Sequence, residues 1–144
     1  MSALPALSVL SAEDDPDIAA VVQIALEISG HRVTVVNNGQ QALDRIEANP
    51  TAYDVVLTDH DMPVMDGLGL TTHLQAGRHA VGVVVHSASL GMRDRQLYQD
   101  LGVTEFLSKP CELARLLTAL HRATRQPLTA RPVHSQLHSS PPGL

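Results

Sequence analysis

Residues 55–67 read VVLTDHDMPVMDG and place three carboxylates directly after an apolar segment. The run Val55–Thr58 is rich in β-branched residues, which is typical of a buried strand. Asp59, Asp61 and Asp66 then follow within eight positions. Two carboxylates about 4 Å apart repel each other by roughly 4 kcal/mol at an effective dielectric constant of about 20. The crowding of acids at this strand end therefore indicates a bound cation.

Polar residues also follow three other apolar segments: Glu13 and Asp14, then Ser87, then Lys109, which is the only lysine in the chain. In a parallel sheet, the carboxyl ends of the strands share one edge, and ligands bind there. Mg²⁺ prefers oxygen ligands that include a few carboxylates. Asp59 beside such a cation could attack a phosphoryl donor, and Ser87 and Lys109 could contact the phosphoryl oxygens. These residues predict a magnesium and phosphoryl site.

Short apolar runs alternate with longer helical patterns along the chain, which predicts five β/α units. Strands that are apolar throughout are typical of a parallel sheet with helices on both faces, so the expected fold class is α/β, doubly wound. The expected strands are Leu7–Ala12, Arg32–Val36, Asp54–Thr58, Val81–His86 and Glu105–Leu107, and the expected helices are Pro16–Ser29, Gln40–Ala48, Leu68–Gln75, Met92–Leu101 and Glu112–Thr124. We expect an N-terminal extension over 1–6, one domain over 7–124, and a flexible Pro/Ser/His-rich tail over 125–144.

Composition excludes several classes of protein. The 144 residues are 44% apolar, which is enough for one core, and the formal net charge of −5 argues against nucleic-acid and membrane-surface binding. A single cysteine cannot form an internal disulfide and fits a reducing cytoplasm. No apolar run approaches the roughly 18 residues of a membrane span, and the first residues lack the basic start of a signal peptide.

The motifs AEDDPDI (12–18), LTDHDMPVMDG (57–67), HSA (86–88) and LGVTEFLSKP (101–110) together resemble those of response-regulator receiver domains, the CheY-like fold, over about residues 7–124. The resemblance implies a five-stranded parallel sheet in the order 2-1-3-4-5. It also implies a switching module that accepts a phosphoryl group from a histidine kinase or a histidine phosphotransfer protein, with Mg²⁺ as cofactor. Such a module assists only its own phosphorylation and dephosphorylation, so we do not expect an enzyme of the ordinary kind.

The resemblance also assigns roles to individual residues. Asp59 matches the phosphoacceptor, Glu13 and Asp14 match the acidic pair that holds the metal, and the backbone carbonyl of Asp61 would be a further ligand. The residues that would contact or follow the phosphoryl group are Ser87, Lys109 and Phe106, and the bond before Pro110 is usually cis in similar domains. The side chain of Asp61 lies where it could add negative charge and alter the lifetime of the phosphoryl group.

Other residues have a simpler structural interpretation. Asp15 before Pro16 is expected to cap the first helix, and Asp66-Gly67 is expected to form a turn. His86 stands where an aliphatic residue is usual and must find a hydrogen-bond partner, and Cys111 is expected to be a small buried apolar residue. The other histidines show no metal-ligand spacing: His31, His60, His73, His79, His121, His134 and His138.

Two alternative functions remain open from the residues alone. An aspartyl-nucleophile phosphatase would need a second acid near Asp59, and Asp61 is placed for that role. A receiver-like scaffold that is never phosphorylated would not need Glu13, Asp14 and Lys109 together with Asp59.

The first helix predicts a surface for a protein partner. At 100° per residue, a set of five residues is expected to cover the sheet: Ile18, Val21, Val22, Ala25 and Ser29. Ala20, Ile24 and Ile28 form a separate apolar stripe, which is either an exposed partner surface or part of a wide core face. In similar receivers the first helix docks against the bundle that carries the donor histidine, and Ile24 would then pack between partner helices. A homodimer through the helix 92–101, the strand 105–107 and the helix 112–124 is a second expected contact.

Overall fold

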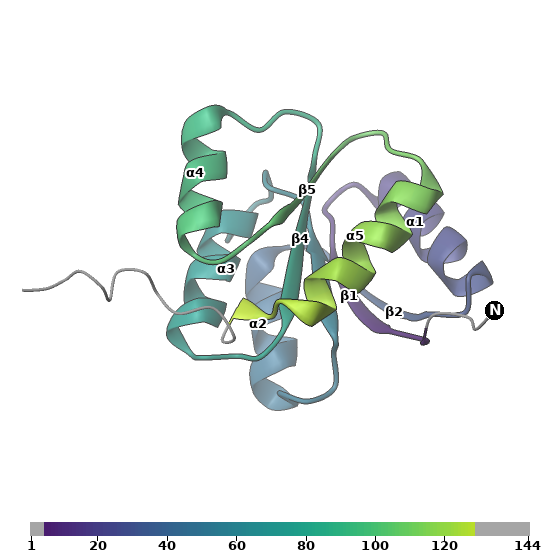
Figure 1. The fold of residues 1–144 in the computed structure, drawn as a ribbon, viewed down its shortest axis with the longest axis horizontal. Helices are drawn as coiled ribbons and strands as arrows, with labels where there is room; N and C mark the ends of the chain where they lie inside the picture. Colours follow the sequence, from purple (N-terminus) through teal and green to yellow (C-terminus); the bar gives the residue numbers. More distant parts are fainter. Residues whose placement is uncertain (1–4, 129–144) are drawn as a thin grey trace, which may run out of the picture.

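The structure is a computed structural model that describes residues 5–128, and strand and helix alternate through it five times (Figure 1). The strands are β1 (Ser8–Ala12), β2 (Arg32–Val36), β3 (Val55–Thr58), β4 (Gly82–Ser87) and β5 (Glu105–Ser108), and the helices are α1 (Pro16–Ile28), α2 (Gly39–Ala48), α3 (Gly67–Ala76), α4 (Met92–Asp100) and α5 (Leu113–Arg125). Every expected element is present, and the ends differ from the expected ones by one residue at most. No helix in this part of the chain is both long enough and apolar enough to cross a membrane.

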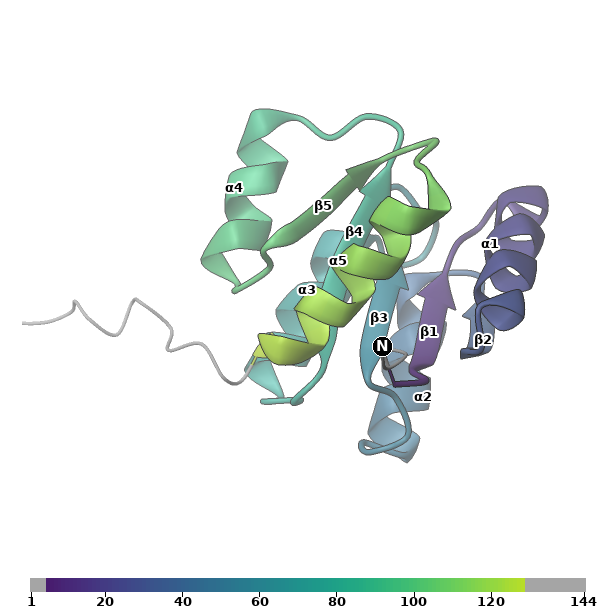
Figure 2. The same ribbon diagram turned by 45° about the vertical axis from the view of Figure 1, so that its right-hand side comes forward.

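The five strands form one parallel sheet in the order β2-β1-β3-β4-β5, which confirms the order expected from the resemblance (Figure 2). Ala12 at the end of β1 pairs with Thr58 at the end of β3. The pairing continues one step further, because the Asp59 N–H donates to the Ala12 carbonyl over 3.0 Å. Glu13 and Asp59 therefore leave the sheet side by side at its carboxyl edge.

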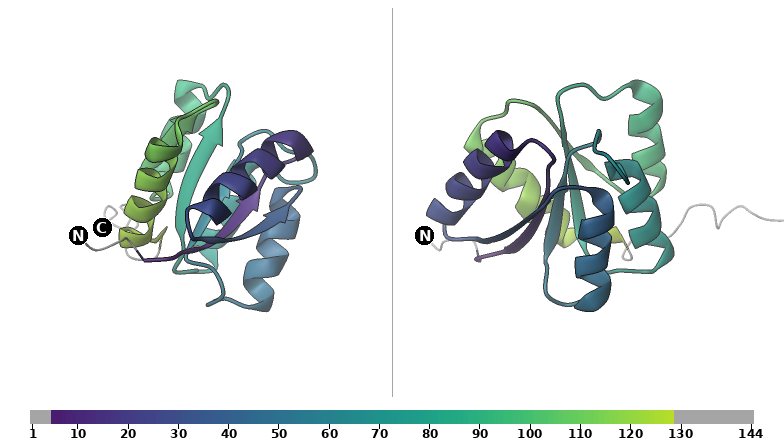
Figure 3. Two further views of the ribbon diagram at one scale, coloured as in Figure 1. Left: turned by 90° about the vertical axis from the view of Figure 1, so that its right-hand side faces the viewer. Right: turned by 180° about the vertical axis from the view of Figure 1, so that it is seen from behind.

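Two apolar layers cover the sheet, with α1 and α5 on one face and α2, α3 and α4 on the other (Figure 3). Side chains alternate between the faces: Leu10 and Val56 belong to the core under α2 and α3, whereas Val9 and Val55 belong to the core under α5. Both faces are buried, so the strands are apolar throughout, as expected for this architecture.

The prediction for the sheet-facing side of α1 is wrong in part. Val21 is 67% exposed, and Ser29 is also exposed, whereas Ala19 and Leu26 are the buried residues of this helix. The reason is the position of α1, which packs mainly on the edge strand β2 and its neighbour β1, so only a narrow line of the helix is covered. Asp15 caps α1 as expected, since its side chain accepts from the Asp17 and Ile18 N–H groups.

The expected start of the tail at residue 125 is also wrong. Helix α5 continues to Arg125, and Leu128 is fully buried among the core residues under α2, α3 and α4. The Leu128 N–H donates to the Val81 carbonyl over 3.1 Å, which fixes the end of the folded unit beside the start of β4. The part of the expected tail over 129–144 lies outside the described residues.

Candidate functional site

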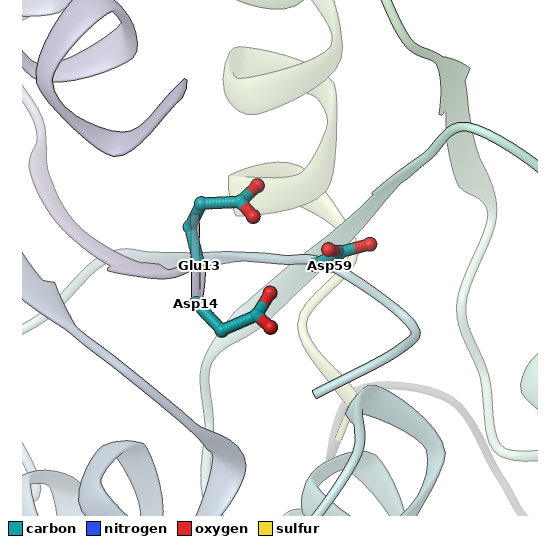
Figure 4. A group of neighbouring side chains, drawn as sticks. All are labelled: Glu13, Asp14 and Asp59. Carbon is teal, nitrogen blue, oxygen red and sulfur yellow. The ribbon is translucent and has the colours of Figure 1, made fainter. Parts of the chain in front are cut away.

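Three carboxylates meet at the carboxyl edge of the sheet: Glu13 and Asp14 after β1, and Asp59 after β3 (Figure 4). One carboxylate oxygen from each residue lies within 4.8 Å of the others. Glu13 and Asp59 are largely buried, whereas Asp14 is exposed to solvent. The structure thus brings together the three residues that the sequence predicts for a cation site.

Lys109 reaches this cluster from the end of β5. Its Nζ donates to Glu13 Oε1 over 2.6 Å and to Asp59 Oδ2 over 3.1 Å. Burial raises the pKa of the Glu13 carboxyl, and the hydrogen bond from Lys109 offsets part of that effect. Burial alone would lower the pKa of Lys109, but its hydrogen bonds with Glu13 and Asp59 outweigh burial and the pKa is raised. The ammonium therefore stays charged and neutralises one of the three carboxylates.

The donor set fits Mg²⁺. All three candidate ligand groups are carboxylate oxygens, and exposed Asp14 leaves the cluster open to water, which Mg²⁺ keeps among its ligands. Lys109 leaves two of the three negative charges uncompensated, so the cluster still attracts a cation. Asp61 lies in the loop after β3 with an exposed side chain.

Ser87 ends β4 next to this cluster and is 5% exposed. Its hydroxyl lies 3.3 Å from the Ser89 carbonyl oxygen, and its backbone carbonyl accepts from the Lys109 N–H over 3.0 Å. The second contact holds the ends of β4 and β5 together, so Ser87 and Lys109 belong to the same edge as Asp59. The Lys109-Pro110 bond is cis.

Phe106 lies in β5 and is half-buried. Its ring packs edge to face with Tyr98 at a centroid distance of 6.1 Å, and the Arg95 guanidinium lies 4.3 Å above it. Phe106 thus lies under α4 rather than at the carboxylate cluster.

His86 in β4 has the partner that the sequence requires. Its Nε2 lies 3.7 Å from the Cys111 sulfur, a contact that joins two neutral groups. Burial and the nearby Lys109 charge lower the pKa of His86, and burial raises the pKa of the Cys111 thiol. Cys111 is half-buried. This arrangement supports the structural role expected for His86, whereas Cys111 is less buried than expected and lines an apolar pocket beside α1.

His60 and Tyr98 were not expected at the site. Tyr98 of α4 is fully buried, and its hydroxyl lies 2.7 Å from His60 Nδ1. His60 Nε2 in turn lies 3.2 Å from Asp94 Oδ2. A Cβ at Gly67 would lie 2.3 Å from the Asp59 carbonyl oxygen and 2.7 Å from the Tyr98 hydroxyl, so only glycine fits there. The one signal in the sequence is a bulky aromatic residue in a mostly polar helix.

The apolar stripe on α1 is exposed, as one of its two interpretations predicts. Ile24 is 58% exposed and Ile28 is 81% exposed, and Ala20 is exposed as well. The same helix borders an apolar pocket of about 480 Å³ that Val21, Val22, Pro110 and Cys111 help to line. Lys109 lines this pocket too, so the pocket extends from α1 to the lysine of the carboxylate cluster.

Comparison with known proteins agrees with the geometry. The model of a family described as the response regulator receiver domain matches residues 9–121. The transcriptional regulatory protein PrrA of Mycobacterium leprae is 34% identical over 118 residues, which cover 82% of this chain and 50% of PrrA. The sensory/regulatory protein RpfC of Xanthomonas campestris is 34% identical over 118 residues, which cover 79% of this chain and 16% of RpfC. The chain therefore spans half or less of these relatives.

A solved structure shares the fold at similar identity. It is the receiver domain of the sensor histidine kinase PA1611 from Pseudomonas aeruginosa PAO1, described with a magnesium ion coordinated in the active site cleft. The TM-score is 0.74 at 30% identity, and the match covers 85% of this chain and all of that one.

Proposed function

The chain belongs to the response-regulator receiver family of two-component signalling, and on this premise we propose that Asp59 is its phosphoacceptor. The observation that carries the proposal is the position of Asp59. Its Oδ2 accepts from Lys109, its Oδ1 accepts from the His60 N–H over 2.7 Å, and it lies beside Glu13 and Asp14. Two fixed donors therefore orient a carboxylate that is 11% exposed at its side chain.

The reaction is the transfer of a phosphoryl group to one carboxylate oxygen. A phosphohistidine donor loses its P–N bond, Asp59 gains a P–O bond, and the leaving imidazole keeps the electron pair of the broken bond and takes up a proton. Lys109, which already donates to Asp59, would contact one oxygen of the incoming group, and the hydroxyl of Ser87 would donate to another. Bound by Glu13, Asp14, Asp59 and the Asp61 carbonyl, Mg²⁺ would supply positive charge to the carboxylates and to the phosphoryl oxygens.

The proposed switch begins at Ser87. In this structure the hydroxyl faces the Ser89 carbonyl oxygen, and contact with a phosphoryl group would replace that interaction. The β4–α4 loop would then move toward Asp59, and Phe106 would follow into the space that the loop leaves. The Arg95 guanidinium of α4 lies over the Phe106 ring and stabilises its present position. A movement of Phe106 would therefore break this contact and alter the surface of α4.

The proposed partner is a histidine kinase or a histidine phosphotransfer protein that docks on α1. Support comes from the exposed stripe of Ala20, Ile24 and Ile28 and from the apolar pocket that joins α1 to Lys109. Ile24 would pack between two partner helices. We place this exchange in the cytoplasm, to which the single cysteine also points.

A homodimer through α4, β5 and α5 stays a second proposal for the interaction surface. A groove on this face is lined by Arg95, Arg115 and Arg122 together with Glu105. In a two-fold contact each residue of one copy meets a complementary residue of the other, so such a dimer would require acidic groups, such as Glu105, to face these arginines.

The phosphatase alternative has less support than the receiver function. A general acid must reach the atoms that react, but the Asp61 side chain is exposed, whereas Lys109 makes the direct contact with Asp59. A scaffold that is never phosphorylated would not require Glu13 and Asp59 to share the largely buried ammonium of Lys109.

Acetyl phosphate and Mg²⁺, followed by intact mass measurement, test the proposed function. We expect one acid-labile phosphoryl group on the wild-type protein and none on Asp59→Asn. The matched control is Asp61→Asn, which removes the same charge two residues away and should still be phosphorylated. Phosphorylation at another residue of the wild-type protein would refute the assignment.

A further inference from the structure

Each polar group of His60, in the backbone and in the ring, has a hydrogen-bonding partner. Its N–H donates to Asp59 Oδ1 over 2.7 Å, and its carbonyl accepts from the Gly67 N–H over 2.9 Å. Nδ1 lies 2.7 Å from the Tyr98 hydroxyl, and Nε2 lies 3.2 Å from Asp94 Oδ2. The backbone contacts belong to the phosphoacceptor loop and α3, whereas both ring contacts belong to α4. One residue thus joins the proposed site to that helix.

The ring contacts are satisfied by one neutral form of histidine. A carboxylate oxygen accepts, so Nε2 carries the proton and donates to Asp94, and Nδ1 accepts from the Tyr98 hydroxyl. Burial, with nearby carboxylates, raises the pKa of Tyr98, so its hydroxyl keeps the proton that it donates. The link therefore exists without any change of charge on His60.

The α4 side of the link is closely packed around Tyr98. Asp94 and Tyr98 lie one helical turn apart, so both face the same neighbour. Tyr98 is fully buried, and its ring packs against His60 at a centroid distance of 5.6 Å and against Phe106 at 6.1 Å. Gly67 leaves no spare room beside the hydroxyl. A shift of α4 must therefore move the His60 ring or break a buried hydrogen bond.

We propose that His60 is a positioning residue through which α4 holds the loop of Asp59 and Asp61 in the geometry that binds Mg²⁺. The inference rests on the proposed function and adds a second connection between the site and α4, separate from the one through Ser87. Because coupling is reciprocal, cation binding at the loop should also change the environment of α4.

The test is a Mg²⁺ titration without a phosphodonor, followed through backbone amide resonances. In the wild-type protein we expect shifts at Glu13 and Asp14 and also at Tyr98 and its neighbours in α4. Tyr98→Phe removes only the hydroxyl. It should weaken Mg²⁺ binding by about threefold or more and abolish the α4 shifts, while the shifts at Glu13 remain.

Two further variants and one control sharpen the result. Asp94→Ala changes a partly exposed side chain and should weaken Mg²⁺ binding without disturbing the core. The double variant His60→Leu with Tyr98→Phe should bind Mg²⁺ no more weakly than His60→Leu alone, because both substitutions remove the same hydrogen bond between His60 and Tyr98. Tyr53→Phe is the matched control, since it removes a hydroxyl from the only other tyrosine and should leave binding unchanged.

The outcomes separate the two proposals. Mg²⁺ affinity and α4 shifts of Tyr98→Phe equal to the wild type would overturn the coupling while leaving the proposed function intact. Additive losses in the double variant would also overturn it, because they mean independent structural effects. A wild-type protein that binds no Mg²⁺ would refute the proposed function and the coupling together.

Discussion

The Lys109 ammonium lies 2.6 Å from the Glu13 carboxylate, the shortest ion pair within residues 5–128. The two residues are 96 positions apart in the chain, so the pair ties the end of β5 to the end of β1 across the sheet. Both side chains are largely buried, at 12% and 7% exposure. The lysine that would contact a phosphoryl group therefore also neutralises a buried carboxylate of the proposed cation site.

Lys109→Met should lower the free energy of unfolding in the presence of a chelator. Glu13 and Asp59 would lose their shared donor, and the cost of an uncompensated buried charge, reduced by access of water, is about 1–3 kcal/mol. Added Mg²⁺ should restore more stability to this variant than to the wild type. Urea unfolding with and without Mg²⁺ measures both effects, and Arg78→Met at an exposed position is the control. Equal response to Mg²⁺ in both proteins would contradict the shared site.

Ser87→Ala should separate phosphorylation from the conformational change. The variant keeps Asp59 and Lys109 and should still be phosphorylated by acetyl phosphate. It lacks the hydroxyl that would follow the phosphoryl group, so the amide resonances of α4, β5 and α5 should change little. Ser108→Ala, at the exposed end of β5, is the matched control and should show the full wild-type response. Full wild-type shifts in Ser87→Ala would refute this role.

Ile24→Lys should slow transfer from the cognate phosphohistidine protein at least tenfold, which corresponds to about 1.4 kcal/mol. Its side chain is 58% exposed, so folding and phosphorylation by acetyl phosphate should stay close to the wild type. Met92→Lys introduces the same charge at an exposed apolar residue of α4 and should not slow transfer. Transfer at the wild-type rate in Ile24→Lys would show that the partner docks elsewhere.

His31 should make the fold sensitive to acid. Its Nδ1 accepts from the Leu7 N–H over 2.9 Å, and burial, with the neighbouring His121, lowers its pKa from the usual 6.5. In the unfolded chain His31 takes up a proton near pH 6.5, whereas in the folded chain it takes up the proton only at lower pH. The free energy of unfolding therefore falls as the pH drops below 6.5.

His31→Asn retains an acceptor for Leu7 but cannot titrate. Between about pH 7.5 and 5.5 the wild type should lose more stability than this variant, by up to about 1 kcal/mol. Urea unfolding at the two pH values gives the difference, in which the other titrating groups cancel. If His31→Asn loses as much stability as the wild type between these pH values, His31 is not the cause of the acid sensitivity.

The strands could be predicted because each is a short apolar run in the sequence. The carboxylate cluster could be predicted because the carboxyl ends of parallel strands share one edge of the sheet. Apolar runs mark β1 and β3, and their carboxyl ends must meet, so the sequence alone predicts that Glu13 and Asp59 lie close together. His60 and Tyr98 could not be paired in this way. They are 38 positions apart, and nothing local indicates that a tyrosine of α4 turns toward the loop after β3.

The same limit explains the error on α1. Helical periodicity gives the angle between Val21 and Leu26, but the direction of the sheet depends on which strands lie beneath the helix. Of these two residues, Leu26 faces the strands and is buried, whereas Val21 is exposed. Leu128 was missed for a related reason, since Pro127 and the polar composition around it favour a loop and do not show that one leucine returns to the core.

The contact between Leu128 and Val81 fixes the edge of the sheet at which the described part of the chain ends. Val81 precedes β4, so this anchor lies at the amino edge of the parallel sheet, whereas Asp59 lies at the carboxyl edge. A tag, linker or fused protein attached after residue 128 would start at the far end of the strands from Asp59, the proposed phosphoacceptor. Immobilising the protein through that end should therefore leave the docking side free for a phosphodonor, whereas a truncation at residue 124 would remove a core side chain.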